Sequence, residues 1–190
     1  MTEKEKCAAG LLYDANYDKQ LIQERIACKD LCVEYNGLKN SDAQRRSELL
    51  RNILGSTKEN LCIEPSFWCD YGYNIEVGEN FYANHNLVIL DCAKVQFGDN
   101  VFIGPNCSFY TAGHPLDAKQ RNQGLEYARP ITVGDNVWLG GNVVVLPGVS
   151  IGKNSVVGAG SVVTKDIPDS VVAVGNPCRV VRDISGENQN

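Results

Sequence analysis

Residues 131–163 read ITVGDNVWLGGNVVVLPGVSIGKNSVVGAGSVV, and an aliphatic residue recurs there at every sixth position. The recurring residues are Val133, Leu139, Val145, Ile151, Val157 and Val163. A period of six fits neither a helix nor a simple alternating strand. It is typical of a parallel β-helix of hexapeptide repeats, so the stretch predicts a mainly β fold of this kind.

The same period runs through two earlier parts of the chain, at Val77, Ala83 and Ile89 and at Phe97, Ile103 and Phe109. Gly and Asn close several repeats, and both tolerate the left-handed backbone that tight corners require. Three sides of six residues make a coil of 18 residues, which is the spacing between Val133 and Ile151. With coils about 4.8 Å apart, five coils predict a prism roughly 24 Å long.

The repeat breaks directly after His114, at the polar segment 115–130. Residues 115–132 have the length of one coil, but the inward positions would be Pro115, Arg121 and Tyr127. A core does not accept an unpaired arginine. We therefore predict a long structureless loop that leaves the prism and returns in phase, and such loops are usually functional.

The first 60 residues carry helical patterns instead. Asp18–Glu34 has apolar residues at helix-compatible spacing, and Ser41–Gln44 reads as a capping box that opens a second helix ending at Gly55. Repeat arrays need such caps at their ends. We predict a helical cap over residues 1–60 and a β-helix over 61–190, with the loop 115–130 and a C-terminal extension.

Composition narrows the class of protein. The net charge of −5 argues against a general nucleic-acid surface, and no apolar run approaches the roughly 20 residues of a membrane span. The first residues carry charges of both signs, unlike a secretory signal, so we expect a cytoplasmic protein with its eight cysteines reduced. Cys28 and Cys32 are one helical turn apart, but no second pair matches them, so we expect buried cysteines and no metal.

An ordered set of short segments carries a family resemblance. The first are Ala9–Asp14 (AGLLYD), Cys69–Asn74 (CDYGYN), Asn80–Asn84 (NFYAN) and Gly113–Pro115 (GHP). The others are Val137–Gly140 (VWLG), Gly158–Gly160 (GAG), Thr164–Pro168 (TKDIP) and Gly175–Arg179 (GNPCR). Together they resemble the hexapeptide-repeat sugar O-acetyltransferases of the maltose and galactoside group, most closely the maltose type. The resemblance covers nearly the whole chain.

That resemblance implies left-handed winding, although parallel crossovers are right-handed in most folds. It also implies acetyl-CoA as co-substrate, no metal, a sugar acceptor, and a homotrimer with active sites between neighbouring prisms. The loop 115–130 would then reach toward the neighbour.

A sugar hydroxyl becomes a good nucleophile only when a base removes its proton, and histidine suits that task near neutral pH. The chain has only His85 and His114. We assign His114, at the junction of wall and loop, as the general base that then supplies the proton to the departing CoA thiolate. Glu126 or a backbone carbonyl would hold its second nitrogen. We leave His85 as structural.

The resemblance implies three acceptor-binding positions, Asp14, Asp70 and Asn84, and we add Asp91 and Trp138 as further candidates. Each has a structural alternative as well. Asp14 could cap a helix, Asp70 and Asn84 could serve as corner residues, and Trp138 could pack on the wall. For Asp91 a role in acceptor binding and a structural role are equally supported.

The chain also departs from the galactoside pattern. Galactoside-type enzymes carry serine where Asp70 stands and aspartate where Cys92 stands. These departures favour a glucose or maltose acceptor.

For the donor, the resemblance implies that a groove for acetyl-CoA is lined by Gly141, Ala159, Thr164 and Lys165. Arg179 and Arg182 would meet the phosphates, for which the forked guanidinium is an effective donor. The alternative is that these basic residues form a solvated end of the prism.

Three competing hypotheses remain open. The same chemistry could act on a galactoside, an antibiotic, an amino acid or a lipo-oligosaccharide. A trimeric zinc hydratase on this scaffold would need three histidine ligands, and the chain has two histidines. A non-catalytic β-helix would not need a histidine beside a loop.

Overall fold

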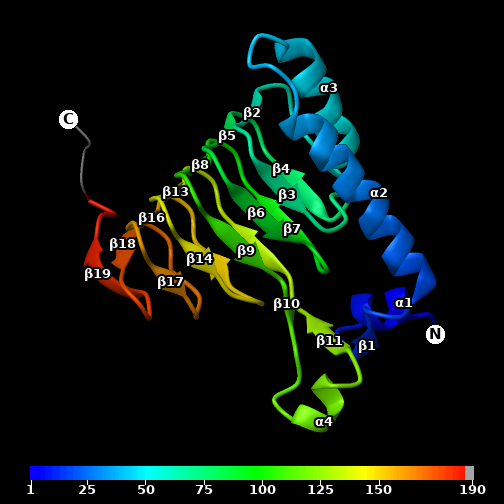
Figure 1. Cartoon of the computed structure of the whole chain (residues 1–190). Coiled ribbons are helices and arrows are strands. Elements are labelled where there is room, and N and C mark those ends of the chain that lie inside the picture. Colours follow the sequence, from blue (N-terminus) through cyan, green and yellow to red (C-terminus); the bar gives the residue numbers. More distant parts are fainter. Residues whose placement is uncertain (187–190) are drawn as a thin grey trace.

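Three walls of short parallel strands build the molecule into a prism (Figure 1). The computed structural model describes residues 1–186. The architecture is the expected left-handed parallel β-helix with a helical cap at one end and a protruding excursion. Within the described residues, none of the helices has the length and apolar character needed to cross a membrane.

The strands stack wall by wall in the order that an 18-residue coil dictates. One wall holds β4 (Ile75–Val77), β7 (Val95–Phe97), β12 (Ile131–Val133) and β15 (Ser150–Ile151). The next holds β2 (Leu61–Ile63), β5 (Phe81–Ala83), β8 (Phe102–Ile103), β13 (Trp138–Leu139), β16 (Val156–Val157) and β18 (Val171–Val174), with β19 (Arg179–Asp183) antiparallel at its edge. The third holds β3 (Phe67–Cys69), β6 (Leu87–Leu90), β9 (Ser108–Tyr110), β14 (Val144–Val145) and β17 (Val162–Val163).

The six-residue period is confirmed by burial. All six recurring residues of 131–163 are buried, from Val133 to Val163. In the earlier coils aromatic rings fill the same interior, with the ring of Phe97 5.0 Å from those of Phe81 and Phe109. Burying each large aliphatic side chain stabilises the fold by roughly 1.5–3 kcal/mol, so the interior residues hold the coils together.

Asparagines form the corners of the prism, as the sequence predicts. Asn80, Asn100, Asn136 and Asn154 all have positive φ. Their side chains also bond from coil to coil: Asn80 donates to Asn100 (2.9 Å), Asn100 to Asn136 (3.0 Å) and Asn136 to Asn154 (2.9 Å). Asparagine thus supplies both the left-handed backbone and a ladder of amide hydrogen bonds along one edge.

The prism is longer than the five coils expected. In residues 1–186 the wall that begins with β2 has six parallel strands, because β18 adds one beyond the last regular hexads. The strand β19 then folds back on β18 and ends the parallel ladder. The run Val171–Val174 lies outside the hexad phase, but its β-branched residues also predict a strand, and β18 confirms it.

Helices cover the N-terminal coils, where Figure 1 shows α2 and α3 beside the first strands. The helices are α1 (Glu3–Ala8), α2 (Lys19–Asn36) and α3 (Ala43–Ile53). The helix predicted over Asp18–Glu34 is confirmed as α2, whose first turn is capped by Asp18. The predicted capping box is wrong: the N-cap of α3 is Asp42 and makes no side-chain cap, while Gln44 bonds to Glu48.

The predicted excursion between the second and third runs is confirmed, but it is not structureless. It contains α4 (Ala118–Arg121) and β11 (Leu125–Ala128). The strand β11 lies between β10 (Ala112–Gly113) and β1 (Tyr13–Asp14), antiparallel to both. A strand in this polar segment depends on partners far away in the sequence, so local pattern could not predict it.

Candidate active site

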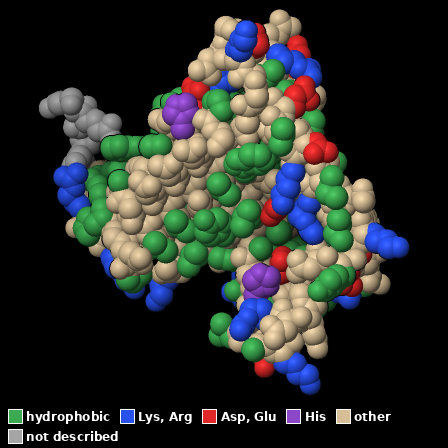
Figure 2. Space-filling view, in the orientation of Figure 1, with side chains coloured by type: hydrophobic (Ala, Val, Ile, Leu, Met, Phe, Trp, Pro, Cys, Tyr) green, Lys and Arg blue, Asp and Glu red, His purple; other side chains and the backbone are tan. Residues whose placement is uncertain are grey.

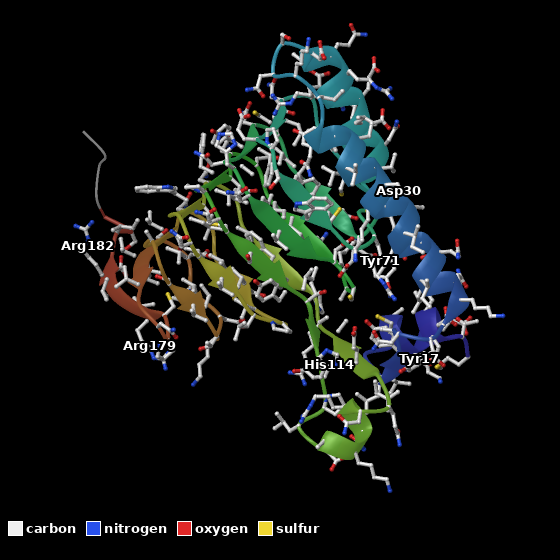
Figure 3. The ribbon with its side chains drawn as sticks, in the orientation of Figure 1. Tyr17, Asp30, Tyr71, His114, Arg179 and Arg182 are labelled. Atoms are coloured by element: carbon white, nitrogen blue, oxygen red, sulfur yellow. The ribbon has the colours of Figure 1, made fainter. Side chains whose placement is uncertain are left out.

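A small sheet outside the prism carries the predicted catalytic histidine. The order β1–β11–β10 pairs Tyr13 with Glu126 and Gly113 with Tyr127. His114 follows β10 directly, so its ring lies beside β11. Figure 2 shows a histidine at the notch between the prism and the excursion, and Figure 3 labels it as His114.

The two ring nitrogens of His114 have different partners. Nδ1 lies 3.1 Å from the carbonyl oxygen of Leu125, which can only accept. Nδ1 therefore carries the proton, and Nε2 has the free lone pair of a base. Nε2 lies 3.9 Å from Glu126 Oε1, and the side chain is 50% exposed. Of the two orienting groups considered from the sequence, the backbone carbonyl holds the second nitrogen, whereas Glu126 lies near the nitrogen proposed as the base.

Glu126 is set back from solvent behind the histidine. Its side chain is 15% exposed, and the hydroxyl of Tyr13 donates to its Oε2 at 3.2 Å. Burial raises the pKa of this carboxyl, while the Tyr13 hydrogen bond and the His114 charge oppose the rise. Sequence reasoning missed Tyr13, because only the β1–β11 pairing brings it here.

Asp91 supports the neighbouring turn rather than facing solvent. It is fully buried, and its Oδ1 accepts from the backbone N–H groups of Asp70 and Tyr71, each at 2.9 Å. Its Oδ2 is buried without a hydrogen-bond partner. Burial raises the pKa of Asp91 to about 6. The structure thus places Asp91 underneath Asp70.

Asp70 itself is largely enclosed and has charged neighbours. Its side chain is 16% exposed, with Oδ1 3.8 Å from Lys29 Nζ and Oδ2 3.8 Å from Cys92 Sγ. Burial raises the pKa of this carboxyl, and the positive charges of Lys29 and Arg25 oppose that effect. Its charge also raises the pKa of Glu126, so the two carboxyls share one electrostatic environment.

Asp14 lies on the same small sheet, opposite Leu125. Its Oδ1 accepts from the backbone N–H groups of Asn16 (3.1 Å) and Tyr17 (2.9 Å), which stabilises the turn after β1. The helix-cap alternative is wrong, because Asp18 caps α2.

Asn84 and Trp138 belong to a different part of the surface. Asn84 follows β5, and its Oδ1 accepts from the backbone of His85 at 2.7 Å. Its φ is not positive, unlike that of Asn86, but Asn84 lies in the turn between β5 and β6, so the corner alternative remains. Trp138 lies on β13, 57% exposed. His114 instead lies beside β11 on the excursion, and among residues 1–186 no hydrogen bond joins it to Asn84.

The predicted donor residues lie on the last coils, at the opposite end from the helical cap. Ala159, Thr164, Lys165, Arg179 and Arg182 are all exposed. Figure 3 shows Arg179 and Arg182 projecting in different directions from the two ends of β19, so they would reach different parts of a ligand. Arg179 also donates to the carbonyl of Cys178 at 2.7 Å.

Gly141 is half-buried and packs against Pro105. A Cβ added at this position would lie 3.3 Å from Pro105, tighter than ordinary contact. Lys165, Arg179 and Arg182 carry the positive charge that phosphate binding requires.

Comparison with known proteins covers the chain end to end. A family profile described as the maltose acetyltransferase hexapeptide capping motif matches residues 6–58, and one described as the hexapeptide repeat of succinyl-transferase matches residues 130–165. A putative acetyltransferase of Saccharomyces cerevisiae is 60% identical over 181 residues, or 95% of this chain and 92% of that relative.

Two solved structures are close in shape as well. A maltose O-acetyltransferase from Clostridium difficile 630 has a TM-score of 0.95 at 51% identity, covering 97% of this chain and 98% of that one. A galactoside acetyltransferase in complex with coenzyme A has a TM-score of 0.94 at 45% identity, covering 97% of this chain and 92% of that one.

Proposed function

Since this chain belongs to the maltose and galactoside O-acetyltransferases, hexapeptide-repeat enzymes that depend on acetyl-CoA, we propose that it acetylates a hydroxyl of maltose or glucose with His114 as general base. Acetyl-CoA supplies the activated acetyl group as a thioester. The observation that carries the proposal is the contact between His114 Nδ1 and the Leu125 carbonyl, which keeps Nε2 unprotonated and available.

His114 acts twice in this scheme. Its Nε2 accepts the proton of the sugar hydroxyl while the new ester C–O bond forms and the thioester C–S bond breaks. The same proton then passes to the departing thiolate, which leaves as the free thiol. Between these steps the ring is positively charged, and the carboxylate of Glu126 at 3.9 Å favours that form.

The acceptor residues fall into two groups in our proposal. Asp70, held by Asp91, accepts a hydrogen bond from a sugar hydroxyl, and Asp14 does so through Oδ2. Asn84 and Trp138 contribute from a second chain, because they lie on another wall. The sugar would then bind where these two surfaces meet.

A homotrimer supplies that second chain. An apolar stripe runs along the outer face of the wall through Tyr82, Phe102, Trp138 and Val156, which are in register. Phe102 is 51% exposed, and Leu116 on the excursion is 97% exposed. Exposed apolar patches of this kind mark interaction sites. We propose that the excursion of one chain packs beside this stripe on the next.

For the donor, we propose that Gly141, Ala159, Thr164 and Lys165 line the groove for the pantetheine arm. Arg179 and Arg182 approach the phosphates from the two ends of β19. The positive charge of the two arginines and the exposure of Ala159, Thr164 and Lys165 support this assignment.

The test is release of free CoA from acetyl-CoA with a panel of acceptors. We expect release with maltose or glucose and less with a galactoside, since Asp70 and Cys92 depart from the galactoside pattern. If CoA is released faster with an antibiotic, an amino acid or a lipo-oligosaccharide than with maltose or glucose, the proposed sugar acceptor is wrong. No release with any acceptor would reject the activity.

A further inference from the structure

Three buried cysteines from two separate elements meet between the helical cap and the prism. Cys69 Sγ lies 3.5 Å from Cys28 Sγ and 3.8 Å from Cys32 Sγ. All three sulfur atoms lie within 4.8 Å of one another, and all three residues are buried. The proposed acetyl transfer uses none of them.

The local folds explain this meeting. Cys28 and Cys32 are four residues apart on α2, so both side chains project from one helix face. Cys69 is the last residue of β3, and its side chain is on the buried side of that strand. The helix packs against β3, which closes the third side of the cluster.

We propose that Cys28, Cys32 and Cys69 form a three-thiolate binding site for a soft monovalent cation, Cu(I). Thiolate is the ligand type that selects soft metals such as Cu(I). A metal about 2.3 Å from each of three sulfurs holds those sulfurs about 4 Å apart. The separations of 3.5 and 3.8 Å therefore need little rearrangement.

The number of ligands favours Cu(I) over zinc. Structural zinc is almost always four-coordinate. Among residues 1–186, no further His, Cys, Asp or Glu joins this group of three. Burial also keeps water from completing a fourth position. A closed three-sulfur site suits Cu(I), which accepts three-coordination.

Binding requires thiolates, so each sulfur that binds as thiolate releases its proton to solvent. No electron is transferred, because the metal enters and stays as Cu(I). The bound ion would tie α2 to the first coils and so stabilise the cap.

The test is a competition titration. The full-length protein, fully reduced and freed of metal, is titrated anaerobically with Cu(I) against a chromophoric Cu(I) chelator. We expect one Cu(I) per chain and a higher melting temperature with the ion bound. Changing even the outer partners of a metal ligand costs about 10–100-fold in affinity, so Cys69→Ala is expected to cost at least as much.

Cys107→Ala is the matched control. Cys107 is also buried in a prism wall, but its Sγ donates to the carbonyl of Gly140 at 3.1 Å, away from the cluster. Its loss should leave Cu(I) affinity unchanged. Failure of the wild type to take Cu(I) from the chelator, or equal affinity in Cys69→Ala, would overturn the proposal.

A second measurement needs no variant, in case Cys69→Ala does not fold. X-ray absorption of the wild-type protein with one Cu(I) per chain reports the atoms bound to copper. Three sulfur neighbours are expected. Two sulfurs, or nitrogen or oxygen neighbours, would contradict a three-thiolate site.

Discussion

At the scale of single residues, the proposed role of His114 rests on what surrounds each ring nitrogen. A carbonyl at Nδ1 fixes the tautomer, and a carboxylate oxygen of Glu126 lies 3.9 Å from Nε2. The Tyr13 hydroxyl in turn bonds to that carboxylate. This chain of contacts ties the N-terminal strand to the catalytic group.

His114→Ala should therefore lower kcat for acetyl transfer by about 10²–10⁴-fold, the usual cost of removing a general base. His85→Ala is the control, because His85 lies in the turn between β5 and β6 and contacts the carbonyl of Pro65 in the turn between β2 and β3. Steady-state kinetics with maltose or glucose measure both variants. A turnover of His114→Ala equal to the wild type would remove His114 from the mechanism.

Asp91 gives a prediction on stability instead. Its pKa of about 6 in the folded protein exceeds the ordinary 3.8, so as pH rises the unfolded chain loses this proton first. The free energy of unfolding should fall by about 3 kcal/mol between about pH 4 and pH 6 on account of this group. The free energy of unfolding of Asp91→Asn should not fall in this way, so the variant should be more stable than the wild type at pH 7. Its amide oxygen can still accept hydrogen bonds from the backbone N–H groups of Asp70 and Tyr71.

Urea unfolding of both proteins from pH 4 to pH 8 measures the difference. Other carboxyl groups titrate in both proteins and cancel when the two curves are subtracted. If the difference in free energy of unfolding between the two proteins does not change with pH, Asp91 has an ordinary pKa in the folded state.

The sequence predicted His114 because histidine is rare in this chain and lies at the break in the repeat. It could not predict which carbonyl would meet Nδ1, since Leu125 reaches the ring only through the β10–β11 pairing. Cys69 was missed beside Cys28 and Cys32 for a similar reason. Side chains brought together by packing leave no spacing signal in the sequence.

At the scale of elements, the β10–β11 hairpin positions the catalytic ring. Gly113 is next to His114, and a Cβ there would lie 2.5 Å from the ring end of Tyr127. Gly113→Ala must push Tyr127 and the hairpin aside. A displacement of about 1 Å near the chemistry can cost about 10²-fold, so we expect a 10–100-fold loss in kcat/KM.

The melting temperature of Gly113→Ala should change little, because the hairpin lies outside the prism core. Gly37→Ala is the control, since its added Cβ would make only ordinary contacts, from 3.5 Å. Kinetics and thermal unfolding separate the two effects. Loss of activity in equal proportion to loss of folded protein would contradict a positioning role.

Elements set by a strict period were predictable, whereas elements that depend on distant partners were not. The hexads predicted the strands of all three walls, because each inward residue must be apolar. The strand β11 was missed because β1 and β10 stabilise it from far away in the sequence. The capping box at Ser41 failed because α3 starts at Ala43, after Asp42.

At the scale of the whole molecule, we propose that one chain presents two separate halves of a site. His114 and Asp70 belong to the half near the excursion, while Asn84 and Trp138 belong to the wall of β5 and β13. The hexad pattern cannot reveal this division, since it specifies one prism and not the packing of neighbours. Exposed Leu116 and the apolar stripe are the features that call for a second chain.

If each site lies between two chains, two inactive variants should repair each other when they are mixed. The His114→Ala chain keeps an intact wall with Asn84, and the Asn84→Ala chain keeps an intact His114. A trimer that contains both variants joins the two intact halves at one of its three interfaces, which is about a third of them. Co-expression with two different affinity tags, followed by tandem purification and kinetics, should recover on the order of that fraction of wild-type activity.

The control is His114→Ala co-expressed with a differently tagged copy of itself, which should stay inactive. Recovery above this control requires chains to share sites, because no single chain in the mixture has both residues. Mixed trimers without recovered activity would place Asn84 and His114 in the same chain's site. Failure to isolate any particle carrying both tags would argue against the trimer itself. The first outcome therefore tests whether two chains share a site, and the second tests whether the chains form a trimer.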